Sequence, residues 1–140
     1  MKPFPYYQQL YQKDCGPTCL RMIAQFYGKT FSSRQMKNIS RIRHKGTTLL
    51  GISEAAEKLG FITSGRKINL EILREISLPI ILHWNQNHFV VLFEIEKATY
   101  QVADPAQGIL KLSESEFLNH WQTADHSEGV VLIIQLSPSF

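Results

Sequence analysis

Apolar residues in the first third of the chain recur with the period of an α-helix. Within residues 15–27 they are spaced three or four positions apart, and Gly28 is a suitable helix end. Asp14 is placed to serve as the N-cap, and Pro17 falls in the first turn, where its missing N–H does no harm. The pattern therefore predicts a helix that begins at Cys15.

The period of the pattern changes from helical to strand-like after about residue 60. Before that point, two more helices are expected, one after Ser32-Ser33 and one over residues 48–59 that ends at Gly60. Beyond it, β-branched and aromatic residues predict strands at 61–68, 79–84, 88–95, 99–104 and 129–136, with short helices at 70–76 and 113–121. Helices followed by an antiparallel sheet define an α+β fold. The 140 residues fit one domain, with a helical half at about 1–60 and a sheet half at about 61–140.

Composition limits the classes of protein to consider. Hydrophobic residues make up 44% of the chain and charged residues 19%, as in a packed globular domain rather than a disordered one. The longest purely apolar runs, at 89–93 and 130–134, are far shorter than the ~18 residues of a membrane span, so the chain by itself is expected to be soluble. Two cysteines and the lack of an N-terminal apolar stretch favour folding in the cytosol.

Cys15 is the strongest candidate for chemistry. At the first turn of a helix, its sulfur would face the positive end of the helix dipole and unpaired backbone N–H groups, which favour a nucleophilic thiolate. Gly16 leaves room for a substrate backbone, whereas the carboxylate of Asp14 would disfavour the thiolate unless it is turned into the cap. The alternative is that Cys15 is only a small buried hydrophobic residue.

Cys19, four residues later, is expected to belong to the core. Helix neighbours at this spacing hold their Cβ atoms about 5–6 Å apart, beyond the ~3.5–4.5 Å of a disulfide. Zinc bound by both cysteines and two histidines is conceivable, but a single pair of cysteines is a weak signal. No metal and no cofactor are therefore expected.

A cysteine nucleophile needs a base, and His88 is the best placed of the five histidines. It begins a predicted strand and Asp104 ends the next one, so in an antiparallel pair the two residues should meet at one end of the sheet. Asp104 would then orient the imidazole. The alternative without a catalytic role is that Asp104-Pro105 is only a turn that ends a strand. His83 lacks such a carboxylate and is expected to pack or to line the cleft.

Acyl transfer also needs hydrogen-bond donors for an oxyanion. The backbone N–H of Cys15 can supply one, and a side-chain amide just upstream can supply another. Gln8, Gln9 and Gln12 are all close enough in sequence, and spacing alone does not choose among them.

Four motifs together resemble the bacteriocin-processing cysteine peptidases, which are the double-glycine leader peptidases fused to bacterial ABC exporters. The motifs are the segment 9–22 with Asp14-Cys15-Gly16-Pro17, then Gly46-Thr47-Thr48, His88-Phe89-Val90-Val91-Leu92 and Asp104-Pro105-Ala106-Gln107-Gly108. They follow the family's order and spacing over nearly the whole chain. The chain departs from the family at Pro17-Thr18, where small residues such as Ala are frequent, and we expect this to alter the start of the helix rather than the chemistry.

The resemblance implies a papain-like fold and assigns four roles. Cys15 would be the nucleophile, His88 the general base, Asp104 its orienting carboxylate and Gln9 the oxyanion donor. Trp84, the bulky residue closest in sequence to His88, is a candidate wall of a narrow cleft, although core packing explains it equally well.

The implied activity is that of a cysteine endopeptidase that removes the leader of a bacteriocin-like peptide after a Gly-Gly or Gly-Ala pair. The expected partners are the leader-bearing precursor and the transmembrane and ATPase parts of an exporter, on the cytoplasmic side of the bacterial cell membrane. An amphipathic leader helix would lie in an apolar groove of the helical half. The segment 60–67 lacks the final Gly-Lys-Ser/Thr of a phosphate-binding loop, so the chain is interpreted as an isolated peptidase domain.

Two other functions stay open at this point. One is a non-catalytic module of the same fold that binds export substrates, and the other is a free-standing protease of different specificity. Charge is uneven as well, since residues 1–47 hold nine Lys/Arg and one acid. The basic stretch from Arg34 to Lys45 has few aromatic residues for stacking, so nucleic acid is not an expected partner. The basic stretch is then either a solvated face or a docking surface for acidic leader residues, lipid head groups or the exporter.

Overall fold

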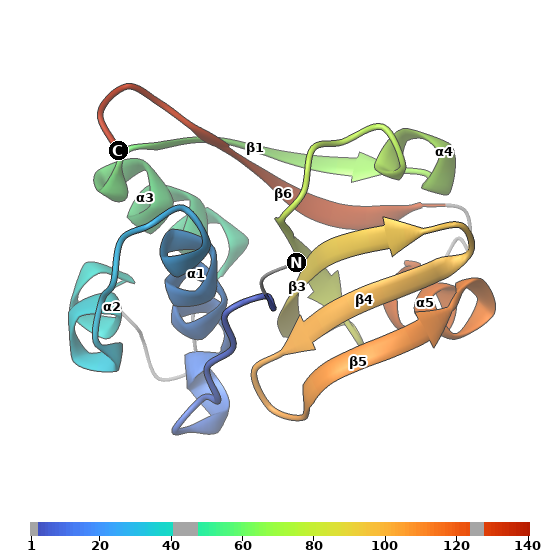
Figure 1. Cartoon of the computed structure of the whole chain (residues 1–140), viewed down its shortest axis with the longest axis horizontal. Helices are drawn as coiled ribbons and strands as arrows, with labels where there is room; N and C mark the ends of the chain where they lie inside the picture. The colour runs from blue at the N-terminus through green and yellow to red at the C-terminus, as the bar shows by residue number, and fades with distance from the viewer. Residues whose placement is uncertain (1–2, 41–47, 124–127) are drawn as a thin grey trace.

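The computed structural model describes residues 3–40, 48–123 and 128–140, which form one antiparallel sheet with helices on both faces (Figure 1). The six strands lie in the order β1-β6-β2-β3-β4-β5, and every neighbouring pair is antiparallel. The helices are α1 (Cys15–Phe26), α2 (Ser33–Ser40), α3 (Leu49–Leu59), α4 (Leu70–Leu73) and α5 (Glu114–Trp121), with a 3-10 turn, η1, at Gln12–Asp14. The strands are β1 (Phe61–Ile68), β2 (Ile80–Trp84), β3 (His88–Glu96), β4 (Thr99–Asp104), β5 (Gly108–Ser113) and β6 (Gly129–Leu136). The α+β architecture expected from the sequence is confirmed.

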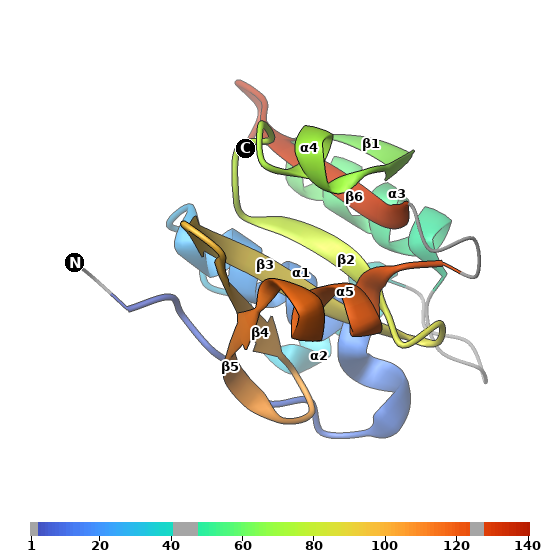
Figure 2. The ribbon, with the colours of Figure 1, turned by 90° about the vertical axis from the view of Figure 1, so that its right-hand side faces the viewer.

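Both faces of the sheet are buried, and each supports its own core. Helices α1, α2 and α3 cover one face, and α4 and α5 lie on the other (Figure 2). Along β3, Phe89 and Val91 join the core under α1, whereas Val90 and Leu92 join the core under α5. A strand that is covered on both sides has no polar face, which explains the apolar run at 89–93. Trp84 is 1% exposed within the α5 core, so of the two roles considered for it, core packing is confirmed and the cleft wall is wrong.

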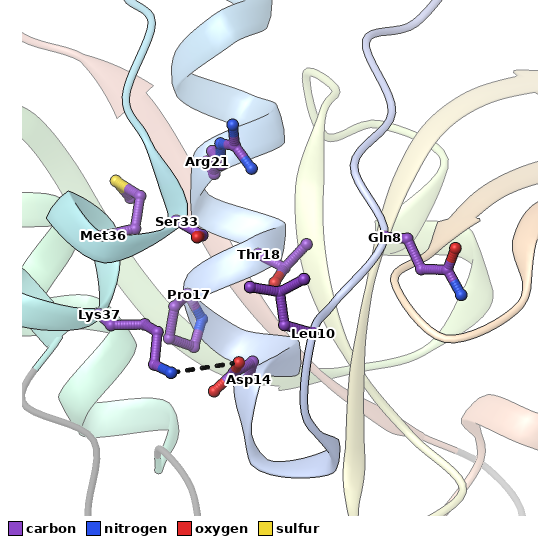
Figure 3. Close-up of a pocket in the computed structure, with 9 residues that line it drawn as sticks. All are labelled: Gln8, Leu10, Asp14, Pro17, Thr18, Arg21, Ser33, Met36 and Lys37. Carbon is purple, nitrogen blue, oxygen red and sulfur yellow. Dashed lines mark ion pairs between the residues drawn. The ribbon is translucent and has the colours of Figure 1, made fainter.

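Asp14 occupies the N-cap position of α1, but its side chain does not cap the helix. It is also the last residue of η1, with φ −92° and ψ 5°, whereas a capping side chain usually stands on extended backbone. The carboxylate is buried at 2% exposure and turns toward α2, where its Oδ2 lies 3.6 Å from Nζ of Lys37 (Figure 3). Oδ1 has no hydrogen-bond partner. The helix start was predicted correctly and its cap was not.

Strand β5 was not predicted, and it completes the sheet beyond β4. Its residues alternate between half-buried and exposed because it is an edge strand. The hairpin that leads into it has a clear local signal: the N–H of Gln107 donates to the carbonyl of Asp104 at 3.1 Å, and Gly108 follows with φ +109°. A tight turn followed by a left-handed glycine is a standard three-residue hairpin loop. Helix α4 is also shorter than predicted, since it ends at Leu73.

Two parts of the expected pattern lie outside the described residues. Segment 41–47 contains Gly46-Thr47 and most of the basic stretch, and segment 124–127 contains His126. Among the residues that the structure describes, no helix combines the length and apolar character needed to cross a membrane.

Candidate active site

Cys15 is the first residue of α1, as the sequence predicted. The buried stripe of this helix packs on β3, and it includes Cys19, Leu20 and Ile23. The packing holds the thiol of Cys15 at the sheet side of the helix N-terminus, where it is free and 8% exposed. The sulfur therefore lies near a helix end with unpaired N–H groups.

His88 and Asp104 come together at one end of the sheet. His88 begins β3 and Asp104 ends β4, and the antiparallel register brings Nε2 of His88 to 2.7 Å from Oδ1 of Asp104. The same oxygen accepts the N–H of Ala106 at 2.9 Å, which fixes the carboxylate against its own turn. With Nε2 engaged by Asp104, Nδ1 is the ring nitrogen left for the sulfur of Cys15.

The electrostatics of the pair favour a charged histidine. Burial alone would lower the pKa of His88, but its hydrogen bonds to Asp104 and to the Cys15 sulfur outweigh burial and raise the pKa to about 9. Burial would raise the pKa of Asp104, but the hydrogen bonds from His88 and from the Ala106 N–H lower it overall. An imidazolium held between a carboxylate and a sulfur is the state that supports a nucleophilic thiolate.

Gln9 lies upstream of the nucleophile, where its side chain ties the preceding loop together. Its Nε2 donates to the carbonyl of Tyr11 at 3.0 Å and to that of Gln12 at 3.3 Å, and its Oε1 is buried without a partner. Both amide hydrogens are therefore used within the loop. Of the other two candidates, Gln8 is exposed and its side chain points away from α1 (Figure 3), and Gln12 is also exposed.

The N-terminal segment is attached to the turn that carries Asp104. The hydroxyl of Tyr6 donates to the Asp104 carbonyl at 2.6 Å, and the N–H of Gln9 donates to the Pro105 carbonyl at 2.9 Å. Burial and then the charge of Asp104 raise the pKa of Tyr6. Sequence reasoning missed Tyr6, because no local pattern connects residues 98 positions apart.

Cys19 and His83 are packed near the site but do not join the pair. Cys19 is fully buried and its thiol donates to the carbonyl of Phe89 at 3.3 Å. Burial raises its pKa well above that of a free thiol, so it stays protonated. His83 packs on the ring of Phe89 at 5.4 Å, and burial lowers its pKa. Throughout the described ranges, no cluster of three or more His, Cys, Asp or Glu side chains is arranged to hold a metal ion.

A thiol at a helix N-terminus, facing a histidine–carboxylate pair on an antiparallel sheet, defines a papain-like cysteine peptidase. The profile of the Peptidase C39 family matches residues 3–135, which is nearly the whole chain. The chain therefore belongs to the Peptidase C39 family.

Relatives of known role are large ATP-binding proteins. The colicin V secretion/processing ATP-binding protein CvaB of Escherichia coli is 35% identical over 117 residues, covering 84% of this chain and 17% of CvaB. The lactococcin-G-processing and transport ATP-binding protein LagD of Lactococcus lactis is 34% identical over 127 residues, covering 86% of this chain and 18% of LagD. The chain thus spans less than a fifth of the length of these relatives.

Solved structures share the fold over almost the whole chain. One is a double glycine motif protease from an AMS/PCAT transporter in complex with the leader peptide, with a TM-score of 0.86 and 28% identity over 95% of this chain and 91% of that one. Another is the peptidase domain of Streptococcus ComA, a bifunctional ABC transporter involved in quorum sensing, with a TM-score of 0.85 and 25% identity over 96% and 100% of the two chains. The papain-like fold expected from the sequence is confirmed.

Proposed function

We propose that this domain cuts the leader from a secreted, bacteriocin-like peptide after a Gly-Gly or Gly-Ala pair, with Cys15 as nucleophile. The observation that carries the proposal is the 2.7 Å contact between His88 and Asp104 beside the Cys15 sulfur. The solved double glycine motif protease with its leader peptide has the same fold, which supports this choice of substrate.

The proposed reaction starts from the thiolate of Cys15 and a protonated His88. The sulfur attacks the carbonyl carbon of the second residue of the Gly-Gly or Gly-Ala pair, which is the last residue of the leader, and the carbonyl electrons move onto its oxygen. When the tetrahedral intermediate collapses, the C–N bond breaks and His88 gives its proton to the leaving amine. The mature peptide leaves, and the leader stays bound to sulfur as a thioester.

The second half of the reaction restores the enzyme. Neutral His88 takes a proton from water, whose oxygen attacks the thioester carbon, and the C–S bond then breaks. The leader departs as a carboxylic acid, with the thiolate and the imidazolium present again. In both steps Asp104 holds the ring orientation through Nε2, so that Nδ1 serves the reacting atoms.

Gln9 is proposed to stabilise the oxyanion together with the N–H of Cys15. Its Nε2 holds the Tyr11 and Gln12 carbonyls in this structure, so one of these bonds must be exchanged when the oxyanion forms. The longer bond, 3.3 Å to Gln12, is the weaker one to give up. The oxyanion site would then be complete only when substrate is bound and the amide of Gln9 has turned to it.

The proposed specificity for small residues requires a narrow approach to the sulfur, where a Cβ on the first residue of the pair, or a side chain larger than a methyl group on the second, would collide. Discrimination by two glycines supplies little binding energy, so an amphipathic leader helix would add a remote apolar contact. The proposed partners are the transmembrane and ATPase units of an ABC exporter, at the cytoplasmic side of the membrane, since CvaB and LagD, of which this chain covers 17% and 18%, are secretion or transport ATP-binding proteins.

Incubation with synthetic precursor peptides, followed by mass spectrometry of the products, tests the proposal. The expected result is one cut after Gly-Gly or Gly-Ala in a peptide with a full leader, and no cut when either glycine is replaced by valine. Replacing the leader's spaced apolar residues by serine should raise KM and leave kcat close to its original value. A tetrapeptide that ends in Gly-Gly and carries an amide-linked chromogenic leaving group on its last carbonyl, with no leader, should be a poor substrate. Efficient cleavage of that tetrapeptide, or of unrelated unfolded proteins, would show a general protease instead.

A further inference from the structure

The turn that carries His88 has an unfavourable backbone conformation. It joins β2 to β3, and the N–H of Asn87 donates to the carbonyl of Trp84 at 3.2 Å. Its two central residues, Asn85 and Gln86, have φ values of +50° and +65°, and neither is glycine. Two successive side chains in the left-handed region persist only where their surroundings hold them. The contacts of this turn therefore reveal what keeps His88 in place.

Helix α5 holds the turn through two hydrogen bonds to Asn85. The backbone N–H of Asn85 donates to the carbonyl of His120 at 2.8 Å, which uses a helix-end carbonyl that has no partner within the helix. The side chains also meet, with Nδ1 of His120 2.7 Å from Oδ1 of Asn85. A carbonyl oxygen only accepts, so Nδ1 of His120 carries the proton.

The helix end that supplies these bonds is itself fixed. The His120 ring stacks on Trp84, the last residue of β2, with centroids 5.0 Å apart and planes 13° from parallel. Phe117 and Trp121, on the same helix, are buried in the core under α5. Figure 2 shows α5 on the face of the sheet opposite α1, with the β2–β3 connection beside its end. The turn is thus held from the face that does not carry the nucleophile.

We propose that Asn85 and His120 form a clamp that positions His88 for proton transfer. The inference rests on the role of His88 in the proposed function. Asp104 fixes the far nitrogen of the ring, and the clamp fixes the backbone from which the ring extends. Both are needed because a proton-transfer group displaced by about 1 Å can lose up to 10²-fold in rate. Asn85 and His120 are positioning residues, since neither reaches the reacting atoms.

Two glycine variants of the same turn separate positioning from folding. Asn85→Gly relaxes a strained φ and removes the side-chain bond to His120, whereas Gln86→Gly relaxes its neighbour and leaves the clamp intact. With a synthetic leader peptide ending in Gly-Gly and a short extension, we expect kcat to fall about tenfold in Asn85→Gly and to stay within about twofold in Gln86→Gly. KM should change little in either variant, and both variants should remain folded, with a Tm well above the assay temperature.

The partner residue supplies an independent check. His120→Ala should reproduce the kcat loss of Asn85→Gly, the double variant should be no worse than either single one, and His120→Gln, which keeps an N–H donor, should recover part of the rate. Alkylation of Cys15 by iodoacetamide needs no peptide and should slow in the same variants. Equal kcat and alkylation rates in the two glycine variants would overturn the clamp, as would a kcat loss that follows a lower Tm. If His88→Ala cuts as fast as the wild type, the role of His88 fails instead, whatever the clamp variants do.

Discussion

Replacing Asp104 by asparagine should move the alkaline limit of activity to lower pH. Asparagine keeps an acceptor near the ring but removes the negative charge of Asp104, which together with the Cys15 sulfur raises the pKa of His88 to about 9. Burial lowers that pKa and is then opposed only by the Cys15 sulfur. His88, the proposed proton donor to the leaving amine, would therefore lose its proton at a lower pH than in the wild type.

The size of the effect follows from the fraction of protonated histidine. At pH 7.5, a group with a pKa of about 9 is almost fully protonated, whereas one at the ordinary 6.5 is roughly one-tenth protonated. If the pKa of His88 fell all the way to 6.5, protonation alone would account for about a tenfold loss in kcat/KM at pH 7.5, which is the upper limit of this effect, and loss of orientation adds to it. The loss should stay smaller than that of His88→Ala, which removes the proton carrier.

The assay is the pH profile of kcat/KM between pH 5 and 10 with a leader peptide. In the wild type, the alkaline limb should lie near pH 9, and in Asp104→Asn it should lie at a lower pH. Tyr6→Phe is the matched control, because it removes the hydrogen bond to the Asp104 carbonyl and leaves the carboxylate in place. An alkaline limb that remains near pH 9 in Asp104→Asn would refute the assignment of this limb to His88.

The free energy of unfolding should also depend on the charge of His88. The pKa of His88 is higher in the folded chain than the ordinary 6.5, so its contribution is fully present below pH 6.5 and is lost as pH rises through about 9. The shift corresponds to at most about 3 kcal/mol. The Tm of the wild type should fall between pH 6.5 and 9.5, and Asp104→Asn should show a weaker fall over the same range.

Three further predictions concern the nucleophile, the oxyanion donor and metal dependence. Cys15→Ala should abolish cleavage while Cys19→Ala keeps most of it, and mass spectrometry after iodoacetamide treatment should find the label on Cys15 first. Gln9→Ala should lower kcat about 10²–10³-fold, whereas Gln12→Ala should not, and the reverse order would shift the oxyanion role to Gln12. EDTA should leave the cleavage rate unchanged, and a loss that zinc restores would favour a metal mechanism.

The parts of the site that sequence reasoning located are those governed by local rules. The start of α1 could be read from helical spacing, and the pairing of His88 with Asp104 followed from the rule that the start of one strand meets the end of the next in a hairpin. Strand β5 was missed although the Asp-Pro-x-x-Gly turn before it was visible, because every second residue of this edge strand is only half-buried and the others are exposed.

The rest could not be predicted because it depends on tertiary contacts. Whether Asp14 caps α1 depends on a 3-10 turn and on Lys37, which lies on another helix. The face on which Trp84 is buried depends on where α5 packs, since both faces of β2 are covered. The bond from Tyr6 to Asp104 joins residues that have no periodic relation.

The attachment of the N-terminal segment to the Asp104 turn has a consequence for when the enzyme becomes active. Gln9 and Cys15 leave the ribosome early, whereas the Pro105 carbonyl that Gln9 binds and the carboxylate that holds His88 are made some ninety residues later. Contacts of such long sequence separation form late, after their loops have closed. An incomplete chain therefore carries the thiol of Cys15 before His88 and Asp104 have met, so the proposed nucleophile has no base until synthesis has passed the turn after β4.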